Sequence, residues 1–280
     1  MKGKSGRSRG LTGLRRKTWD RVLLGAEAEV ISTLAELRGK RWLCRGHSMH
    51  YPSMHPSIDR GPLKHLTRVQ KLTLERQSID LFRDTARYFA HPGEQGALVD
   101  EIVTLMVLRH YDVPTRLLDW TKSPYVAAYF AVCDHEAEDG ELWSFDYPTY
   151  ELRGKQQWMK WPNTTVDGSG RDDKFDAKLT AFTVDEPEDW FTCGFYSPGF
   201  PRQLSQDGVF TLTSRFGRDH SEALQRLLGR KSCCRTFVIP AALKPALARI
   251  LREKHGIWQG SLFPDSAGAA ATAKSVFRIK

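Results

Sequence analysis

The sequence predicts an α+β fold: a single mixed domain in which a small central sheet is flanked by helices. Helical and strand-like patterns alternate irregularly along the chain, without the regular strand–helix repeat of a parallel α/β sheet. Hydrophobic residues make up 40% of the 280 residues, which suits a sizeable core and excludes a disordered chain.

The first part of the chain is mainly helical in pattern. Residues 27–38 are amphipathic and end at a glycine, so they predict a helix, and residues 41–45 predict a short strand. A long helical pattern covers residues 63–90 until a His-Pro-Gly break, and a further helix is expected at 97–110.

Two prolines divide the middle of the chain. Val113 is forced into an extended conformation by Pro114, and Ser123 with Pro124 predicts a helix start with serine as the N-cap. We expect a loop between these points, leading into a buried helix over the almost wholly apolar residues 125–133.

The second half mixes both patterns around a polar stretch, residues 162–189, that predicts an irregular insertion able to gate a site or bind a protein partner. The elements predicted there are strands at residues 141–146, 209–212 and 235–239, a helix at 222–228, and a helix that follows Pro240 and stops at Gly256.

The net charge of +9 is concentrated in a Gly/Ser-rich tail, residues 1–17, that contains no acidic residue. Because such a tail is usually solvated, we expect any contact with nucleic acid to be a salt-sensitive contact with the phosphate backbone. The seven basic residues of this tail are Lys2, Lys4, Arg7, Arg9, Arg15, Arg16 and Lys17.

A cytoplasmic location is expected, without contact with a membrane. The longest apolar run, residues 126–133, is far shorter than the roughly 20 residues that span a bilayer, and no apolar segment follows the basic N-terminus. The five cysteines show no CxxC motif, which predicts reduced thiols, and their spacings do not fit zinc sites.

Common catalytic and metal motifs are missing from the sequence. It contains no GxGxxG, Walker A, HExxH or GxSxG motif. His47, His50 and His55 lie close together, but no carboxylate stands at ligand spacing, so we expect no metal site.

Three stretches carry more polar residues than packing requires. Arg45 ends the first predicted strand just before Gly46, where a guanidinium suits a phosphate or carboxylate. The alternative is that Arg45 pairs with an acidic neighbour such as Asp119 and joins two elements. Arg202 and Gln206 precede a later strand, and an ordinary turn is the better explanation of them if this segment is taken alone.

The polar stretch before the helix start at Ser123 is the most informative. Because helix N-termini favour anions, this segment is well placed to bind one. Capping would explain Asp119 and Thr121, but it would leave Thr115 and Arg116 unexplained.

Together these stretches resemble the FRG domain family, named for an aromatic-Arg-Gly tripeptide. The resemblance covers about residues 25–275, so residues 18–280 are expected to form an FRG domain; Cys44 replaces the usual aromatic residue. The matching segments are Arg45-Gly46-His47 with Pro56-Ser57 and Arg60, His110-Tyr111, Pro114 to Thr121 with Pro124, Ala127 to Ala131, Arg202 with Gln206 and Gly208-Val209-Phe210, Val238-Ile239-Pro240, and Leu262 to Asp265.

The chain is also similar, more weakly, to ADP-ribosyltransferases of the Arg–Ser–Glu type. That similarity implies an ADP-ribosyltransferase-like core in which Arg45 holds the NAD phosphates and hydroxyl groups support the strand under the nicotinamide ribose. Such enzymes also need a group that holds the ribose hydroxyl as positive charge develops. In the expected later region, around Gln206, we find no Glu-x-Glu or Gln-x-Glu motif, and Gln206 and Asp119 are the candidates for this role.

The resemblances imply a bacterial toxin or antiphage effector that acts on NAD or a related nucleotide, with Arg45, Asp119 and Gln206 as catalytic residues. The missing glutamate leaves altered transfer, NAD hydrolysis alone and no catalysis all open. The residues expected to bind NAD are Arg45, Gly46, His110, Thr115, Arg116, Trp120, Thr121 and Arg202.

The alternative is a non-catalytic module that binds phosphate or nucleic acid. It would hold a phosphate with Arg45, Arg116 and Arg202, while the basic tail adds affinity.

Overall fold

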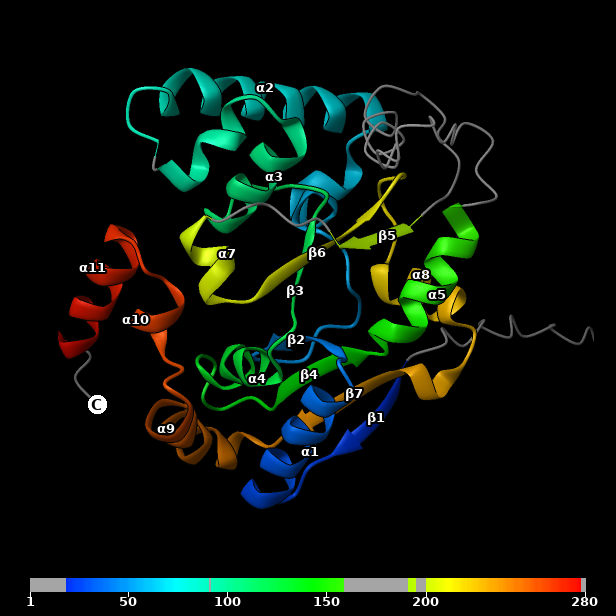
Figure 1. Cartoon of the computed structure of the whole chain (residues 1–280), viewed down its shortest axis with the longest axis vertical. Coiled ribbons are helices and arrows are strands. Elements are labelled where there is room, and N and C mark those ends of the chain that lie inside the picture. Colours follow the sequence, from blue (N-terminus) through cyan, green and yellow to red (C-terminus); the bar gives the residue numbers. More distant parts are fainter. Residues whose placement is uncertain (1–18, 91, 159–190, 195–199, 278–280) are drawn as a thin grey trace, which may run out of the picture.

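A computed structural model describes residues 19–90, 92–158, 191–194 and 200–277 (Figure 1). The expected basic tail and the expected insertion at 162–189 lie outside these residues. The strands are β1 Asp20–Leu23, β2 Leu43–His47, β3 Leu118–Thr121, β4 Gly140–Phe145, β5 Phe191–Gly194, β6 Gly208–Thr213 and β7 Cys234–Ile239. The α-helices are α1 Glu27–Gly39, α2 Arg68–Ala86, α3 Glu101–His110, α4 Pro124–Val132, α5 Tyr147–Trp158, α7 Pro201–Ser205, α8 His220–Leu228, α9 Lys244–His255, α10 Gln259–Leu262 and α11 Ser266–Lys274. The 3₁₀ turns are η1 Ser57–Asp59, η2 Gly61–His65, η3 Pro92–Leu98, η4 Lys231–Cys233, η5 Ala241–Leu243 and η6 Ser275–Phe277.

The seven strands form one mixed sheet in the order β1-β7-β4-β2-β3-β6-β5. Only β1 and β7 are parallel; every other neighbouring pair is antiparallel. This arrangement confirms the predicted fold class, a sheet flanked by helices. The sheet is larger than predicted because the sequence pattern did not reveal β1, β3 or β5.

The sheet opens between its two central strands. β2 pairs with β4 over five positions, whereas β2 and β3 pair only at Cys44 and Thr121. In Figure 1, β3 runs across the direction of β2 and β4, so the strands separate beyond that pair. Arg45 follows Cys44 directly and Asp119 lies two residues before Thr121, which places both side chains where the sheet divides.

Helix α4 lies unusually close to β2 and β4. A Cβ atom at Gly46 would stand 1.8 Å from the backbone oxygen of Ala127, and one at Gly140 would stand 2.2 Å from that of Ala131. The two glycines and the two alanines that face them therefore permit a separation that no larger side chain allows. This contact fixes β2, and with it Arg45, against the start of α4.

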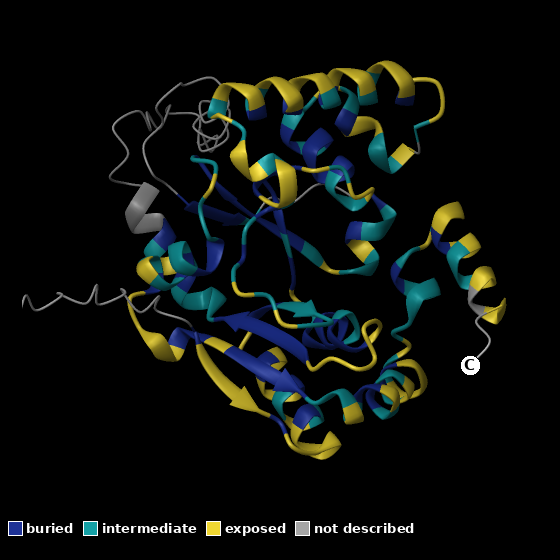
Figure 2. Ribbon diagram, turned by 180° about the vertical axis from the view of Figure 1, so that it is seen from behind, coloured by how far each residue is buried: buried dark blue, intermediate teal, exposed yellow. Residues whose placement is uncertain are grey.

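Three hydrophobic clusters hold the layers together. The first joins α1, α4 and α9 to one face of β2, β4 and β7, and the second joins α5 and α8 to strand residues on the other face. The third packs α2 and α3 on β6. Figure 2 shows buried strands in the middle of the molecule and an exposed outer side of α2.

Capping residues explain where the helices depart from the predicted bounds. The pattern over residues 63–90 predicted one helix, but α2 begins only after Thr67, which forms a capping box with Gln70. Similarly, α3 begins after Asp100, whose carboxylate accepts a hydrogen bond from the backbone N–H of Val103 at 2.9 Å. By contrast, α1 and α4 begin at or near the predicted residues.

The prediction of a loop before α4 was wrong over residues 118–121, which form β3. These residues pair with β6 along their whole length and bury Leu118 and Trp120 in the second cluster. The strand therefore depends on a partner about 90 residues away in sequence, which local patterns do not reveal.

We predict that Gly46→Ala lowers the free energy of unfolding by about 3 kcal/mol, the upper end of the cost of overpacking, because the new methyl group meets backbone. Urea unfolding would measure this. The matched control is Gly39→Ala, where nothing lies within 4 Å of a new Cβ atom. Equal stabilities of the two variants would show that α4 can move away from β2 at little cost.

Candidate functional site

A cavity of about 270 Å³ lies where β2 and β3 separate, and we call it the central cavity. Strand ends, α4, and the later α7 and α10 segments all contribute side chains to it. Its lining residues are Cys44, Arg45, Gly46, Arg109, His110, Asp112, Asp119, Trp120, Thr121, Val126, Phe130, Arg202, Gln206 and Phe263.

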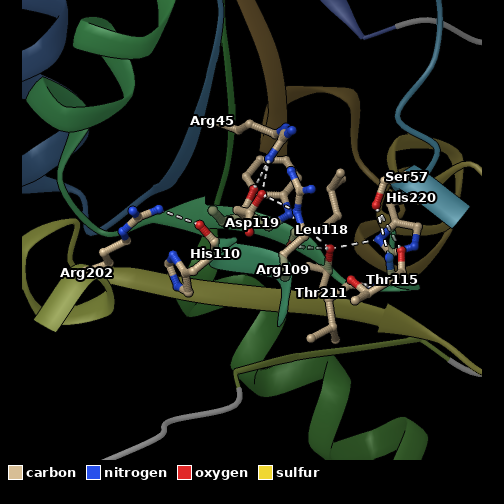
Figure 3. A network of polar contacts seen from close by, with 12 residues as sticks. Arg45, Ser57, Arg109, His110, Thr115, Leu118, Asp119, Arg202, Thr211 and His220 are labelled. Atoms are coloured by element: carbon tan, nitrogen blue, oxygen red, sulfur yellow. Dashed lines mark hydrogen bonds and ion pairs between the residues drawn. The ribbon is translucent and has the colours of Figure 1, made fainter. Parts of the chain in front are cut away.

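Asp119 is the centre of charge in this cavity, and two arginines converge on it (Figure 3). Arg45 Nη1 donates to the Asp119 backbone oxygen at 2.7 Å and to Oδ2 at 3.3 Å, and Arg109 Nε donates to Oδ2 at 2.9 Å. Burial acts to raise the pKa of Asp119, but the charges of Arg109 and Arg45 outweigh it and hold that pKa at about 2. The carboxylate is therefore charged at neutral pH.

His47 fixes the other side of the Arg45 guanidinium. Arg45 Nε donates to His47 Nε2 at 2.8 Å, so the ring proton must sit on Nδ1. Burial, followed by the charge of Arg45, lowers the pKa of His47 well below its usual value, so the ring is neutral. Burial also lowers the pKa of Arg45, to about 10, which leaves its guanidinium charged at neutral pH.

Arg202 forms the opposite wall of the cavity. Its guanidinium pairs with Asp265, donates to the backbone oxygen of His110 at 2.6 Å, and lies 4.7 Å from the ring centroid of Tyr111 and 5.2 Å from that of Phe263. Figure 3 shows Arg202 reaching toward His110 from a neighbouring element. These contacts tie α7 to α3 and to the C-terminal segment.

Gln206 and Thr121 close the floor of the cavity. Thr121 Oγ1 donates to the backbone oxygen of Gln206 at 2.6 Å and accepts from the Ser123 N–H at 3.0 Å. Gln206 Nε2 donates to the backbone oxygen of Leu262 at 3.1 Å. This bond orients the amide and leaves its Oε1 as an acceptor.

Residues 40–140 match the family model of the FRG domain. The chain contains an FRG domain. The match includes Arg45, Arg109 and Asp119, whereas Arg202 and Gln206 lie beyond it. No curated protein and no solved structure matches the chain.

The structure brings together most of the residues expected to form the site. All three expected catalytic residues line the central cavity. The expected binding residues that line it are Arg45, Gly46, His110, Trp120, Thr121 and Arg202. Of these, Trp120 is buried and bonds through Nε1 to Thr211 at 3.0 Å, so it supports the floor more than it exposes polar groups.

Thr115 and Arg116 lie away from the central cavity. Arg116 is buried and bonds through Nε to both carboxylate oxygens of Glu75, at 3.1 and 2.8 Å, with its guanidinium 4.3 Å from the ring centroid of Phe216. The Thr115 backbone accepts from and donates to Ser57 (Figure 3). The FRG-type Thr-Arg pair thus holds neighbouring segments in place in this structure.

The sequence analysis did not select several residues of the site. Arg109 is the most important of them, and its only sequence signal was its place next to His110 at the end of a predicted helix. Asp112 lines the cavity in a left-handed conformation with φ of 61°, which aspartate tolerates better than most residues. Phe130 and Phe263 supply apolar wall; both lie in segments that match the family pattern, but that match gave them no role in a site.

The three neighbouring histidines have separate partners. Besides His47, His50 Nδ1 lies 2.7 Å from Glu141 Oε1, and His55 Nδ1 lies 3.0 Å from Ser53 Oγ. Within the described ranges, no group of three or more His, Cys, Asp or Glu side chains is arranged to hold a metal ion. Among the helices described, none combines the length and apolar character required to cross a bilayer.

Arg116 and Glu75 form a buried ion pair, so Arg116→Ala would leave the Glu75 carboxylate buried without its partner. We predict that this lowers the free energy of unfolding by about 3–5 kcal/mol. The control is Arg76→Ala, which removes an exposed arginine from the same helix as Glu75. This variant should change the free energy of unfolding by less than about 0.5 kcal/mol. Thermal and urea unfolding of both variants, compared with the wild type, would measure these differences. A fully stable Arg116→Ala protein would contradict the structural role.

Asp119 should make stability depend on pH in the acid range. Because its pKa in the folded protein is about 2, below the ordinary value of 3.8, its charged form stabilises the fold above pH 4 and this contribution is lost as pH falls toward 2. The contribution is about 2 kcal/mol at most, by the usual 1.36 kcal/mol per pKa unit.

The corresponding measurement is urea unfolding of the wild type and Asp119→Asn from pH 2 to pH 7. The stability difference between them should be constant above about pH 5 and should narrow below pH 4. Asp84→Asn, at an exposed position on α2, should stay within about 0.5 kcal/mol of wild type. A difference that is independent of pH would show that the arginines do not lower the pKa of Asp119.

Proposed function

We propose that this protein is an ADP-ribosyltransferase-like effector that acts on NAD or a closely related nucleotide in a bacterial cytoplasm, as a toxin or antiphage defence protein. One observation supports this above the others: Arg45, Asp119 and Gln206, from three separate segments, line one cavity at the division of the sheet. The five cysteines are all free, which agrees with a reducing compartment.

Arg45 is suited to hold a phosphate of the nucleotide. Its guanidinium is charged, fixed by Asp119 and His47, and only partly buried, with 14% of its side chain exposed. A guanidinium held in this way presents its remaining N–H groups without losing conformational freedom on binding. Asp119 acts through Arg45 as a positioning residue, because its carboxylate already accepts from two arginines.

Gln206 is suited to hold a ribose hydroxyl. Its Nε2 is bound to the Leu262 carbonyl, so Oε1 is the free acceptor, which a 2′-hydroxyl can donate to. When the bond between nicotinamide and the ribose breaks, nicotinamide leaves with the electron pair and positive charge develops on the sugar. A fixed dipole beside that charge stabilises the transition state.

The reaction is completed when an acceptor attacks the sugar. Water would give hydrolysis, and a hydroxyl or amine of another molecule would give ADP-ribosyl transfer; in either case the attacking group releases a proton. Asp112 is the carboxylate of the central cavity that has no ion pair within the described segments, and its exposed side chain could accept that proton.

A non-catalytic phosphate-binding module is the second candidate. It is favoured by the lack of a glutamate among the described residues of the central cavity, and by the engagement of Asp119 and Asp265 with arginines. Such a module would use the same Arg45 but would release nothing from the nucleotide.

The test is nicotinamide release from NAD by the purified chain. We expect Arg45→Ala to abolish turnover and weaken NAD binding. We expect Gln206→Ala to lower kcat by about 100-fold with little change in binding, as for loss of one polar group that stabilises the transition state. Arg249→Ala, an exposed arginine on α9 outside the cavity, should behave as wild type. NAD binding that depends on Arg45 without any nicotinamide release, over a range of added acceptors, would establish the binding module instead.

A further inference from the structure

A second compartment, of about 250 Å³, lies beside the central cavity, and we call it the Arg60 compartment. The two share Arg45, Gly46, Arg109 and Phe130, so they are adjoining parts of one cleft. Among the residues that line the Arg60 compartment and not the central cavity are His47, Arg60 and Asp134.

Positive charge in this compartment exceeds negative charge. Arg45 and Arg109 share the single carboxylate of Asp119, and Arg60 has no hydrogen bond or ion pair from its side chain to any described residue. Asp134 stands at the rim with 74% of its side chain exposed, 3.8 Å from His135. Three guanidiniums, with only the half-buried carboxylate of Asp119 between them, leave an excess of positive charge that a bound anion would neutralise.

Arg60 contributes to that excess of charge. Burial, and then the neighbouring charge of Arg109, lower the pKa of Arg60 from its usual value. Arg60 is an exposed residue, so the compartment is open to solvent on its side. Its side chain lines the same compartment as Arg45 and Arg109, and several guanidiniums around one space are the arrangement that phosphate-binding sites use.

A neutral donor lies in the same wall. His47 must carry its proton on Nδ1, because Nε2 accepts from Arg45, and within the described residues this buried Nδ1 has no hydrogen-bond partner. This Nδ1 has almost no accessible surface, so a ligand can reach it only if the ring turns. The guanidiniums are therefore the groups that an anion in the compartment would contact.

The backbone that carries Arg60 is rigidly held. The preceding residue, Asp59, forms a buried ion pair of 2.6 Å with Lys71, and the Arg60 N–H donates to Ser57 O at 3.2 Å. Ser57 in turn bonds to both backbone groups of Thr115. The backbone of Arg60 is thus fixed before any ligand arrives, and only its side chain has to become ordered on binding.

We infer that the Arg60 compartment binds phosphate carrying two negative charges, with Arg60 and Arg45 as its clamp, while the nucleoside end occupies the central cavity. This deepens the proposed function and rests on it for the identity of the nucleotide. The chemistry fits a diphosphate diester, as in NAD and ADP-ribose, or a terminal phosphate monoester, as in AMP. Arg60 is then a second binding residue of the site, about fifteen residues after the arginine that gives the family its name.

Isothermal titration calorimetry with ADP-ribose, AMP, pyrophosphate and adenosine would test the inference. For Arg60→Ala, we expect affinity for the preferred phosphate compound to fall about 10- to 100-fold, with adenosine unaffected, as for loss of a hydrogen bond to a charged group. Arg60→Lys should recover part of the loss. Lys64→Ala removes the same charge from an exposed position four residues later, and should leave every affinity unchanged. Preference for ADP-ribose over AMP identifies the diphosphate, and the reverse identifies the monoester.

Several outcomes would overturn the inference. These are unchanged affinity in Arg60→Ala, an equal loss for adenosine, or no binding of any phosphate compound, pyrophosphate included. Binding that depends on Arg60 but is confined to a single-stranded oligonucleotide would overturn it in favour of nucleic acid. By contrast, a protein that binds pyrophosphate through Arg60 and releases no nicotinamide from NAD would support phosphate binding by the Arg60 compartment. The same result would contradict the proposed action on NAD.

Discussion

The carboxylate of Asp119 is the interaction on which the site depends. Two guanidiniums stand beside it at the one place where the sheet divides, and without a shared counter-charge they would repel each other in a partly buried setting. The carboxylate comes from β3, while the arginines come from β2 and the end of α3. One ion-pair cluster therefore joins three elements and prepares a cationic surface, so stability and ligand binding rest on the same atoms.

The polar residues of the FRG domain divide into two groups according to where the sheet places them. Arg116 and Thr115 face the interior and hold α2 and the Ser57 turn against the start of β3. Arg45 and Asp119 face the cleft. This division explains why so short a sequence block contains so many polar side chains: one part builds the support for Arg60 and the other forms the cavity wall.

Sequence patterns predicted the elements whose ends carry local signals. Ser123 and Pro124 located α4, and Gly256 located the end of α9, because caps act within a few residues. They did not reveal β3, which exists through its pairing with β6. The same limit applies to the site. Arg45 and Gln206 were selected from motifs, and Arg60 was part of a matching segment without a role. The place of Arg60 and Arg109 beside Arg45 arises from the fold, which no local pattern encodes.

The wall formed by Arg202 bears on how much of this chain constitutes a working unit. Residues 40–140 carry the family match, yet the guanidinium opposite Arg45 comes from α7 and is anchored by Asp265, far downstream. A polypeptide limited to the matched segment would contain the cationic half of the cleft but would lack β6, the floor beside Thr121, and the facing wall. The segment that matches the family therefore supplies only one side of the cleft. The other side comes from downstream residues that the family match does not include.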